Sequence, residues 1–156
     1  MKIYLITIGQ SLPKWIQEGY HEYAKRMPPE CTLELIELPG VKRTKGYPVA
    51  KIIAEESEQL KKAIPKNCHV VALDEHGTLW DTMKLSQQLV QWQQQGQNMA
   101  LLVGGADGLA EDCKRLAQQL WSLSPLTLPH GLVRIVVAEQ LYRAWSVLNC
   151  HPYHRA

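Results

Sequence analysis

The stretch Leu123-Ser124-Pro125-Leu126-Thr127-Leu128-Pro129-His130 is rich in leucine and has the apolar character of a buried strand. Proline, however, lacks the N–H group that a sheet ladder needs, and buried hydroxyl groups need hydrogen-bond partners. Ser124, Pro125 and Thr127 therefore fit poorly together in the middle of a core strand. We predict a strand over Ser122–Leu128 whose backbone groups line a pocket.

Strands and helices alternate along the whole chain. Strands are predicted at Lys2–Gly9, Thr32–Leu38, His69–Asp74, Met99–Gly104 and Ser122–Leu128. Helices are predicted at about 13–26, 49–64, 110–120 and 132–149, and one opens at the N-cap residue Asp81 with Leu85, Leu89 and Trp92 as its apolar stripe. Several strands are continuous apolar runs, which is typical of strands covered on both faces. The pattern predicts an α/β fold with a mostly parallel sheet and helices on both faces.

The composition is that of a soluble globular protein. Its 156 residues are enough for a single domain over 1–156, and 46% apolar with 21% charged residues is an ordinary balance. No apolar run approaches the ~20 residues that a membrane helix needs, so no membrane partner is expected. Four cysteines without CxxC spacing indicate cytosolic thiols and a cytoplasmic location. A net charge of +2 neither announces nor excludes a nucleic-acid partner.

The last predicted helix has more apolar surface than one sheet can cover. One face at helical spacing is made by Val133, Val137, Leu141, Ala144 and Leu148, and other sides add Ile135, Val136, Tyr142 and Val147. A second buried contact would account for this surplus, most simply a symmetric homodimer. The alternative is a central helix of a monomer.

Two loops follow predicted strands, where ligands of parallel sheets bind. Gly104 and Gly105 open one of them, although neither GxGxxG nor GxxxxGK[ST] is present and a tight turn would explain the glycines equally well. Asp74 and Glu75 in the other could form a carboxylate pair, but a turn with capping acids is favoured by Gly77. If the strands are neighbours, the three ends at Leu73, Gly104 and Leu128 converge on one pocket.

The remaining polar motifs are each open to two interpretations. The histidines offer no convincing metal set, because His151 and His154 lie in a chain-terminal tail, and no metal is predicted. Glu139 and Arg143 are spaced as a helical ion pair, which could belong to the surface, an interface or a site. The basic segment Val41–Gly46 could contact phosphate or simply be solvated.

Four motifs in order closely resemble the ribosomal RNA large subunit methyltransferase H family. They are Leu101–Leu109 (LLVGGADGL), Trp121–His130 (WSLSPLTLPH), Ala138–Trp145 (AEQLYRAW) and His151–Arg155 (HPYHR). The resemblance covers essentially the whole chain, and one departure is Ala106-Asp107 where family members have proline and glutamate. It implies the SPOUT α/β-knot fold with a C-terminal trefoil knot, which is an exception to the rule against threaded chains.

The resemblance also implies a function. A homodimer would transfer a methyl group from S-adenosylmethionine to N3 of a pseudouridine in 23S ribosomal RNA of the large subunit, within the assembled ribosome. The implied cofactor contacts are Leu73, Gly104, Leu123, Ser124, Pro125, Leu126, Thr127 and Leu128. From the residues alone, a doubly wound nucleotide-binding hydrolase and a non-catalytic ribosome-binding factor remain alternatives.

Methylation at N3 requires removal of an imide proton, so a base or a group that stabilises the anion is needed. The catalytic candidates are His154, Arg155, Tyr153 and Arg143, with Glu139 and His130 as further possibilities. The tail directly follows the helix expected to form one wall of the pocket. We therefore expect a short distance between the tail and the cofactor.

Overall fold

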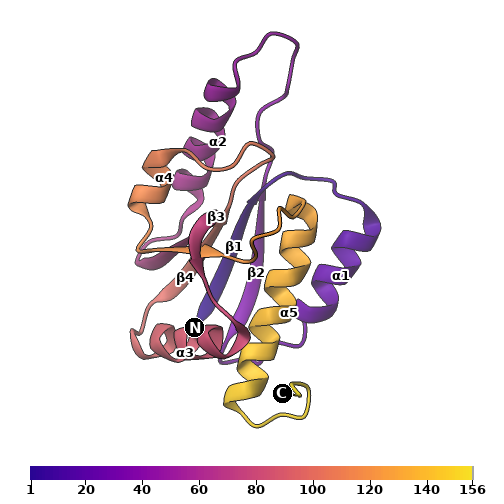
Figure 1. The fold of residues 1–156 in the computed structure, drawn as a ribbon, viewed down its shortest axis with the longest axis vertical. Coiled ribbons are helices and arrows are strands. Elements are labelled where there is room, and N and C mark those ends of the chain that lie inside the picture. The colour runs from indigo at the N-terminus through magenta and orange to yellow at the C-terminus, as the bar shows by residue number, and fades with distance from the viewer. Residues whose placement is uncertain (156) are drawn as a thin grey trace.

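The computed structural model describes residues 1–155 (Figure 1). Its elements follow in the order β1 (Lys2–Ile8), α1 (Lys14–Ala24), β2 (Thr32–Leu38), α2 (Val49–Ala63), β3 (Cys68–Leu79), α3 (Thr82–Gln94), β4 (Asn98–Val103), α4 (Glu111–Leu116), β5 (Gln119–Ser122) and α5 (His130–Leu148). The predicted alternation of strands and helices is confirmed.

The five strands form one sheet in the order β2-β1-β4-β3-β5, and every neighbouring pair is parallel. Central β1 and β4 carry the most deeply buried residues, among them Ile3, Leu5 and Leu101, which are inaccessible to solvent. Continuous apolar runs in these strands are explained by cover on both faces.

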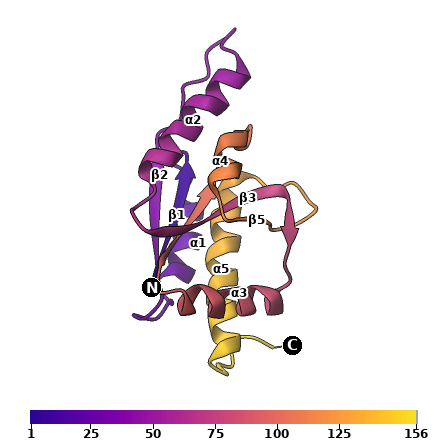
Figure 2. The same cartoon turned by 90° about the vertical axis from the view of Figure 1, so that its left-hand side faces the viewer.

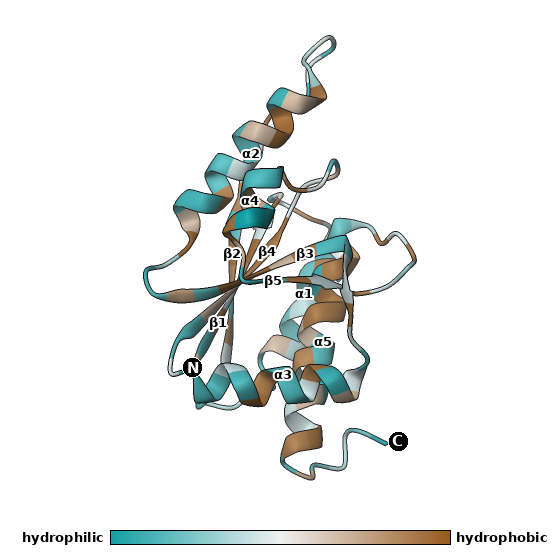
Figure 3. Ribbon diagram, turned by 60° about the vertical axis from the view of Figure 1, so that its left-hand side comes forward, coloured by the Kyte–Doolittle hydropathy of each residue, from teal (hydrophilic) through white to brown (hydrophobic). Residues whose placement is uncertain are grey.

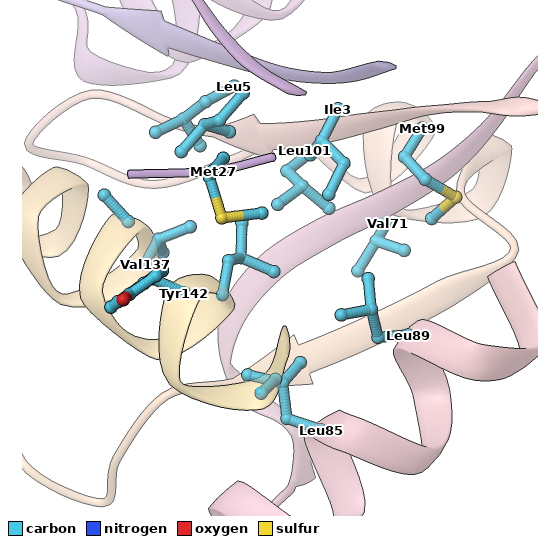
Figure 4. Packing of buried hydrophobic residues seen from close by; sticks show 14 of the residues in the cluster. Ile3, Leu5, Met27, Val71, Leu85, Leu89, Met99, Leu101, Val137 and Tyr142 are labelled. Carbon is cyan, nitrogen blue, oxygen red and sulfur yellow. The ribbon is translucent and has the colours of Figure 1, made fainter. Parts of the chain in front are cut away.

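Helices lie on both faces of the sheet, as predicted (Figures 1 and 2). On one face, Tyr20 of α1, Leu85 of α3 and Val137 of α5 belong to a single core cluster with residues of β1, β3 and β4. Figure 4 shows side chains of α3 and α5 directed toward Leu5 and Leu101. On the opposite face, α2 and α4 cover the sheet with their own cluster, which includes Leu60.

Helix α3 begins as its sequence predicts. Asp81 precedes its first turn, and its Oδ1 accepts a hydrogen bond from the backbone N–H of Lys84 at 2.8 Å. Leu85, Leu89 and Trp92 are buried. The N-cap and the apolar stripe together fix where this helix starts and which side faces the sheet.

The predicted strand at Ser122–Leu128 is wrong. Strand β5 ends at Ser122, and the chain from 123 to 129 has no regular structure. The Ser124 hydroxyl accepts a hydrogen bond from the N–H of Leu126 at 2.9 Å, which bends the chain. Pro125 and Pro129 cannot donate to a ladder, so the segment does not pair with the sheet.

The predicted helix over 110–120 is too long, because α4 ends at Leu116. The next residues pair with β3 instead: the Gln118 N–H donates to the Val70 carbonyl at 2.9 Å, and the Val70 N–H donates to the Gln118 side chain at 2.7 Å. One backbone hydrogen bond, one side-chain hydrogen bond and burial of the following Trp121 outweigh the extra helical turn.

Strand β3 is longer than predicted and continues through the expected turn at 75–77 to Leu79. Its register against β5 shifts between Leu73 and Thr78. A Cβ atom on Gly77 would lie 2.7 Å from the backbone of Leu120, so glycine permits β5 to approach closely. Gly77 therefore marks a close strand contact rather than a turn.

Helix α5 packs between α1 and α3 on one face of the sheet. Of its predicted apolar face, Val137, Leu141 and Ala144 are fully buried, whereas Leu148 is exposed. The part of α5 that is apolar but absent from the core cluster comprises Leu132, Val136, Val147 and Leu148. Figure 3 shows hydrophobic residues recurring along the helix. Three of them, Leu132, Val136 and Val147, share one side of the helix away from the buried stripe, and we name these three the outer apolar face.

No helix within residues 1–155 is both long and apolar enough to span a membrane.

Candidate functional site

A pocket of about 300 Å³ lies beyond the carboxyl ends of β4 and β5 and beside β3. It is lined by three segments and by the start of α5: Leu73–Glu75, Val103–Leu109, the run 121–128 without Pro125, and His130 with Val133. Parallel sheets bind ligands at this edge. The predicted convergence of Leu73, Gly104 and Leu128 on one pocket is confirmed, although only Gly104 directly follows a strand.

The glycine loop, residues 104–109, is folded tightly on itself. Gly105 and Gly108 form an isolated antiparallel bridge, and Gly108 has a φ of +85°. A Cβ atom on Gly104 would lie 2.7 Å from the backbone carbonyl group of Gly108. Glycine at 104 is therefore required by the turn itself, and the turn leaves backbone groups facing the pocket.

The segment 123–128 forms another wall of the pocket. Leu126 is 73% exposed although it lies in this wall, which leaves a large apolar side chain uncovered. Pro125 is exposed and does not line the pocket. Its part is to keep the segment out of the sheet, as described above. A ligand with an apolar portion would cover Leu126.

Asp74 and Glu75 line the pocket but do not form a carboxylate pair. Asp74 lies 3.5 Å from the Lys114 ammonium group, whereas Glu75 lies 3.5 Å from the ring of His76. The acids extend along β3 instead of capping a turn, so neither of the two interpretations holds. Asp107, a third acid of the lining, forms an ion pair with Arg43.

His130 opens α5 at the pocket wall. No side chain caps the helix N-terminus in the described chain, so its first N–H groups carry partial positive charge toward this end. Burial lowers the pKa of His130, and the nearby charge of Arg134 lowers it further, against a smaller opposite effect of Glu56. The imidazole is therefore neutral at neutral pH and can accept a proton.

The C-terminal tail forms a second polar cluster around Glu139. The Tyr153 hydroxyl donates to Glu139 Oε2 at 2.8 Å, and the Arg143 guanidinium donates to the same carboxylate at 3.0 Å. Arg143 also lies 3.3 Å from His154 Nδ1, whereas Arg155 is exposed. The predicted ion pair between Glu139 and Arg143 is confirmed, and it organises the tail.

Aromatic contacts hold this tail cluster in place. The Tyr153 ring lies 4.7 Å from that of Tyr142, and the guanidinium groups of Arg143 and Arg26 lie 4.8 and 5.8 Å from its centre. Burial raises the pKa of Tyr153, and the hydrogen bond to Glu139 raises it further. Tyr153 therefore keeps its proton at neutral pH and acts as a hydrogen-bond donor, in a tail that is packed rather than loose.

The pocket includes His130 at the start of α5, whereas the tail cluster is built on Glu139 and Arg143 further along the helix. Figures 1 and 2 show that the tail leaves the other end of α5. His130 and Glu139 are nine positions apart, which is about 13 Å along a helix axis. The expected short distance between tail and pocket is therefore wrong within one chain. The structure brings together seven of the eight predicted cofactor residues, and separately brings together Tyr153, His154 and Arg143.

Several pocket residues were missed by reasoning from sequence, among them Trp121, Asp107 and Val133. Trp121 and Asp107 lie inside the motifs that carry the family resemblance, next to the predicted contacts. That position would have allowed both residues to be predicted. Val133 belongs to the apolar face predicted for the last helix, and that role gave no reason to expect it in the pocket. No group of three or more histidine, cysteine, aspartate or glutamate side chains in residues 1–155 is arranged to hold a metal.

Comparison with known sequences gives full-length matches. A family profile described as "Predicted SPOUT methyltransferase" matches residues 1–154. A protein of Thioalkalivibrio sulfidiphilus named "Ribosomal RNA large subunit methyltransferase H" is 52% identical over 155 residues, which is 99% of both chains. A protein of Hahella chejuensis with the same name is 51% identical over the same length.

Solved structures support the fold. A "probable methylase family protein" from Haemophilus influenzae superposes with a TM-score of 0.56 at 14% identity, covering 99% of this chain and 70% of that one. A "probable methyltransferase" from Bordetella pertussis gives 0.56 at 16% identity, covering 91% and 95%. Identities this low show a shared fold and nothing more. The trefoil knot stays a prediction.

Proposed function

This chain belongs to the ribosomal RNA large subunit methyltransferase H family of SPOUT methyltransferases, and from that premise we propose that it methylates N3 of a pseudouridine in 23S ribosomal RNA of the large subunit. The observation that carries the proposal is the pocket formed by the glycine loop, the segment 123–128 and the start of α5. The cytoplasm, where ribosomes work, is its proposed location.

The methyl donor is S-adenosylmethionine, whose sulfonium supplies an already activated methyl group. The pocket fits it: Leu73, Leu123 and Leu126 offer apolar contacts for the adenine, and backbone groups of the glycine loop offer hydrogen bonds. The uncapped N-terminus of α5 would hold the carboxylate. The Glu75 carboxylate on the β3 side suits the positive groups of the donor.

The chain must also make N3 of the base nucleophilic. Neutral His130 at the pocket wall can accept a proton there. The tail offers donors: the Tyr153 phenol and the Arg143 guanidinium, with His154 and Arg155 beside them. Such donors would stabilise negative charge on the base carbonyls and orient the base against the donor methyl.

One copy of the chain does not hold both halves of this machinery together, because the tail cluster lies toward the far end of α5 from the pocket. We therefore propose a homodimer in which the tail of the partner completes the site. The outer apolar face of α5, which comprises Leu132, Val136 and Val147, is the proposed contact. Recognition of the assembled ribosome rather than free RNA is part of the same proposal.

Val136→Glu tests the dimer, because Val136 is partly exposed and a charge there should prevent association without touching the core. Leu141 and Val137 are fully buried, so charges there would test folding instead. Val49→Glu is the matched control, since Val49 is 51% exposed on α2. Light scattering should give a monomer for Val136→Glu and a dimer for the control; a monomeric wild type would contradict the proposal.

Methyl transfer itself is tested with radiolabelled S-adenosylmethionine and ribosomes that lack the modification. Nucleoside mass spectrometry of the 23S RNA should then find N3-methylpseudouridine. Ribosome binding without transfer would favour the non-catalytic ribosome-binding factor. Nucleotide hydrolysis without cofactor binding would favour the hydrolase.

A further inference from the structure

The segment 39–48 between β2 and α2, which we name the arm, extends beyond the rest of the molecule (Figures 1 and 2). Lys42, Arg43 and Lys45 are exposed in it, and it contains no acidic residue. Neither Lys42 nor Lys45 forms an ion pair with any of residues 1–155. The arm thus presents uncompensated positive charge on a projecting part of the surface.

Helix α2 fixes the base of the arm. The Gly40 N–H donates to Gln59 Oε1 at 3.0 Å, and Gln59 Nε2 donates back to the Gly40 carbonyl at 3.2 Å. At the other end of the arm, the Tyr47 hydroxyl donates to Glu55. The two ends are therefore anchored, while the basic residues lie on the part between them.

Glu56 connects the base of the arm to the glycine loop. It is 5% exposed, and its Oε2 accepts a hydrogen bond from the Val41 N–H at 3.2 Å. Its other oxygen would lie 2.7 Å from a Cβ atom on Gly105, and Oε2 would lie 2.9 Å from one on Gly40. A single buried carboxylate thus fills the space between the two loops, so neither can shift far without displacing it.

A second connection lies at the rim of the pocket. The Arg43 guanidinium forms an ion pair with the carboxylate of Asp107. Asp107 belongs to the glycine loop and lines the pocket. Arg43 and Asp107 are 64 positions apart in the sequence, and their contact joins the basic part of the arm directly to the proposed cofactor site.

We propose that the arm binds the phosphate backbone of the substrate RNA through Lys42 and Lys45, and that Arg43 and Glu56 couple this binding to the cofactor site. The inference rests on the proposed function. An exposed ion pair alone is weak, and three neighbouring positive charges repel one another. Phosphates beside Lys42 and Lys45 relieve that repulsion and hold the arm where Arg43 meets Asp107. RNA and cofactor then favour each other's binding, by the same factor in both directions.

RNA contact is tested with Lys42→Gln/Lys45→Gln and, as matched control, Lys62→Gln/Lys66→Gln, which removes the same charge from exposed positions elsewhere. The probe is ribosomes lacking the modification, titrated between 50 and 200 mM salt. The arm variant should bind them about tenfold more weakly with a salt slope reduced by about two, and the control should match the wild type. Equal behaviour of the two variants would overturn the RNA contact.

Coupling is tested with S-adenosylhomocysteine, which avoids turnover. Its Kd for the wild type should fall about fivefold when ribosomes saturate the enzyme. Arg43→Gln and Asp107→Asn should each reduce that factor below about twofold. The double variant should reduce the factor no further than either single variant, and the exchange Arg43→Asp/Asp107→Arg should restore it. An unchanged factor in Arg43→Gln would overturn the coupling, as would a Kd that rises with ribosomes.

Failure of this inference differs from failure of the proposed function. If the wild-type enzyme methylates ribosomes and the arm variant does so equally well with an unchanged salt slope, the role of the arm is refuted and the proposed function stands. Wild-type enzyme that neither binds nor methylates ribosomes refutes the proposed function and the inference with it.

Discussion

The two ends of α5 are built in opposite ways. At its N-terminal end the pocket is formed by a tight glycine loop and by an irregular segment that has left the sheet, with apolar side chains such as Leu126 beside their backbone groups. At its C-terminal end the tail cluster is made of side chains, with Glu139 at its centre and Tyr153 and Arg143 donating to it. One end offers shape and fixed dipoles, and the other offers charged groups and hydrogen-bond donors.

This difference suits a division of labour. A methyl donor that never varies is well served by backbone groups that cannot change protonation. Activation of a weak nitrogen nucleophile needs groups that stay protonated and donate hydrogen bonds to the developing anion. The pKa values of Tyr153 and Arg143 are both raised through Glu139, with burial the larger cause for Tyr153, so both groups keep their protons. The predictions below separate the two functions, beginning with the largest expected effect.

Deleting the tail from Tyr153 onward should lower methyl transfer at least ~100-fold while cofactor affinity stays within about threefold. The reason is that the tail lies well away from the pocket of its own chain. Calorimetry and single-turnover transfer to ribosomes measure the two quantities. His154→Ala keeps Tyr153 packed against Tyr142 and should show part of the loss. Full activity of the truncated enzyme would remove the tail from the mechanism.

Mixing two inactive variants tests whether the halves come from different copies. Gly104→Ala supplies an intact tail, and the truncated chain supplies an intact pocket. After exchange of subunits, half of the dimers are mixed and each has one complete site, so about a quarter of wild-type activity should return. No recovery despite proven exchange would contradict the composite site.

Gly104→Ala alone should weaken cofactor binding at least ~30-fold, about 2 kcal/mol. Its Cβ atom would meet the Gly108 backbone at 2.7 Å, so the glycine loop has to move. Gly96→Ala is the control, because Gly96 has a φ of +72° but open space around it. That variant should lose about 1 kcal/mol of stability and bind the cofactor normally. Equal cofactor affinity in both variants would show that the loop does not form the site.

The smallest effect concerns His130, whose pKa is lowered in the folded chain by burial. Below its ordinary pKa of about 6.5, the unfolded chain takes up the proton before the folded chain does. Its contribution to stability is therefore complete above that pH and is lost as the pH falls toward the lower folded pKa. Urea unfolding followed by tryptophan fluorescence should show a shallower decline from pH 7 to 5 for His130→Gln. Parallel curves would place His130 in solvent.

Periodicity and local signals predicted the parts of the fold that depend on nearby residues. Asp81 as an N-cap and the stripe from Leu85 to Trp92 are examples, since both depend on contacts within a few turns. The end of α4 and the course of β3 could not be predicted this way. They depend on Gln118 and Gly77 meeting strands that are distant in sequence, and a local pattern does not contain those partners.

The candidate site was predicted residue by residue mainly from the family resemblance, with strand-end reasoning pointing to the same place. Leu128 lines the pocket although it does not lie in a strand. The prolines on either side of it keep the segment out of the sheet and in the loop. The distance from Tyr153 to the pocket was mispredicted. Sequence order places the tail after α5, but the direction of the helix carries it away from the strand ends.

The strand order has a consequence for the growing chain. During synthesis β1, α1 and β2 leave the ribosome first, and β1 can pair with β2 at once. The other edge of β1 stays unpaired until β4 has been made. That partner is complete only at Val103 of 156 residues, so during about two-thirds of synthesis an apolar edge stays open. Unpaired edges of this kind recruit other strands, and non-local parallel pairing is slow to form. The nascent protein is thus most prone to aggregation until its fourth strand has emerged.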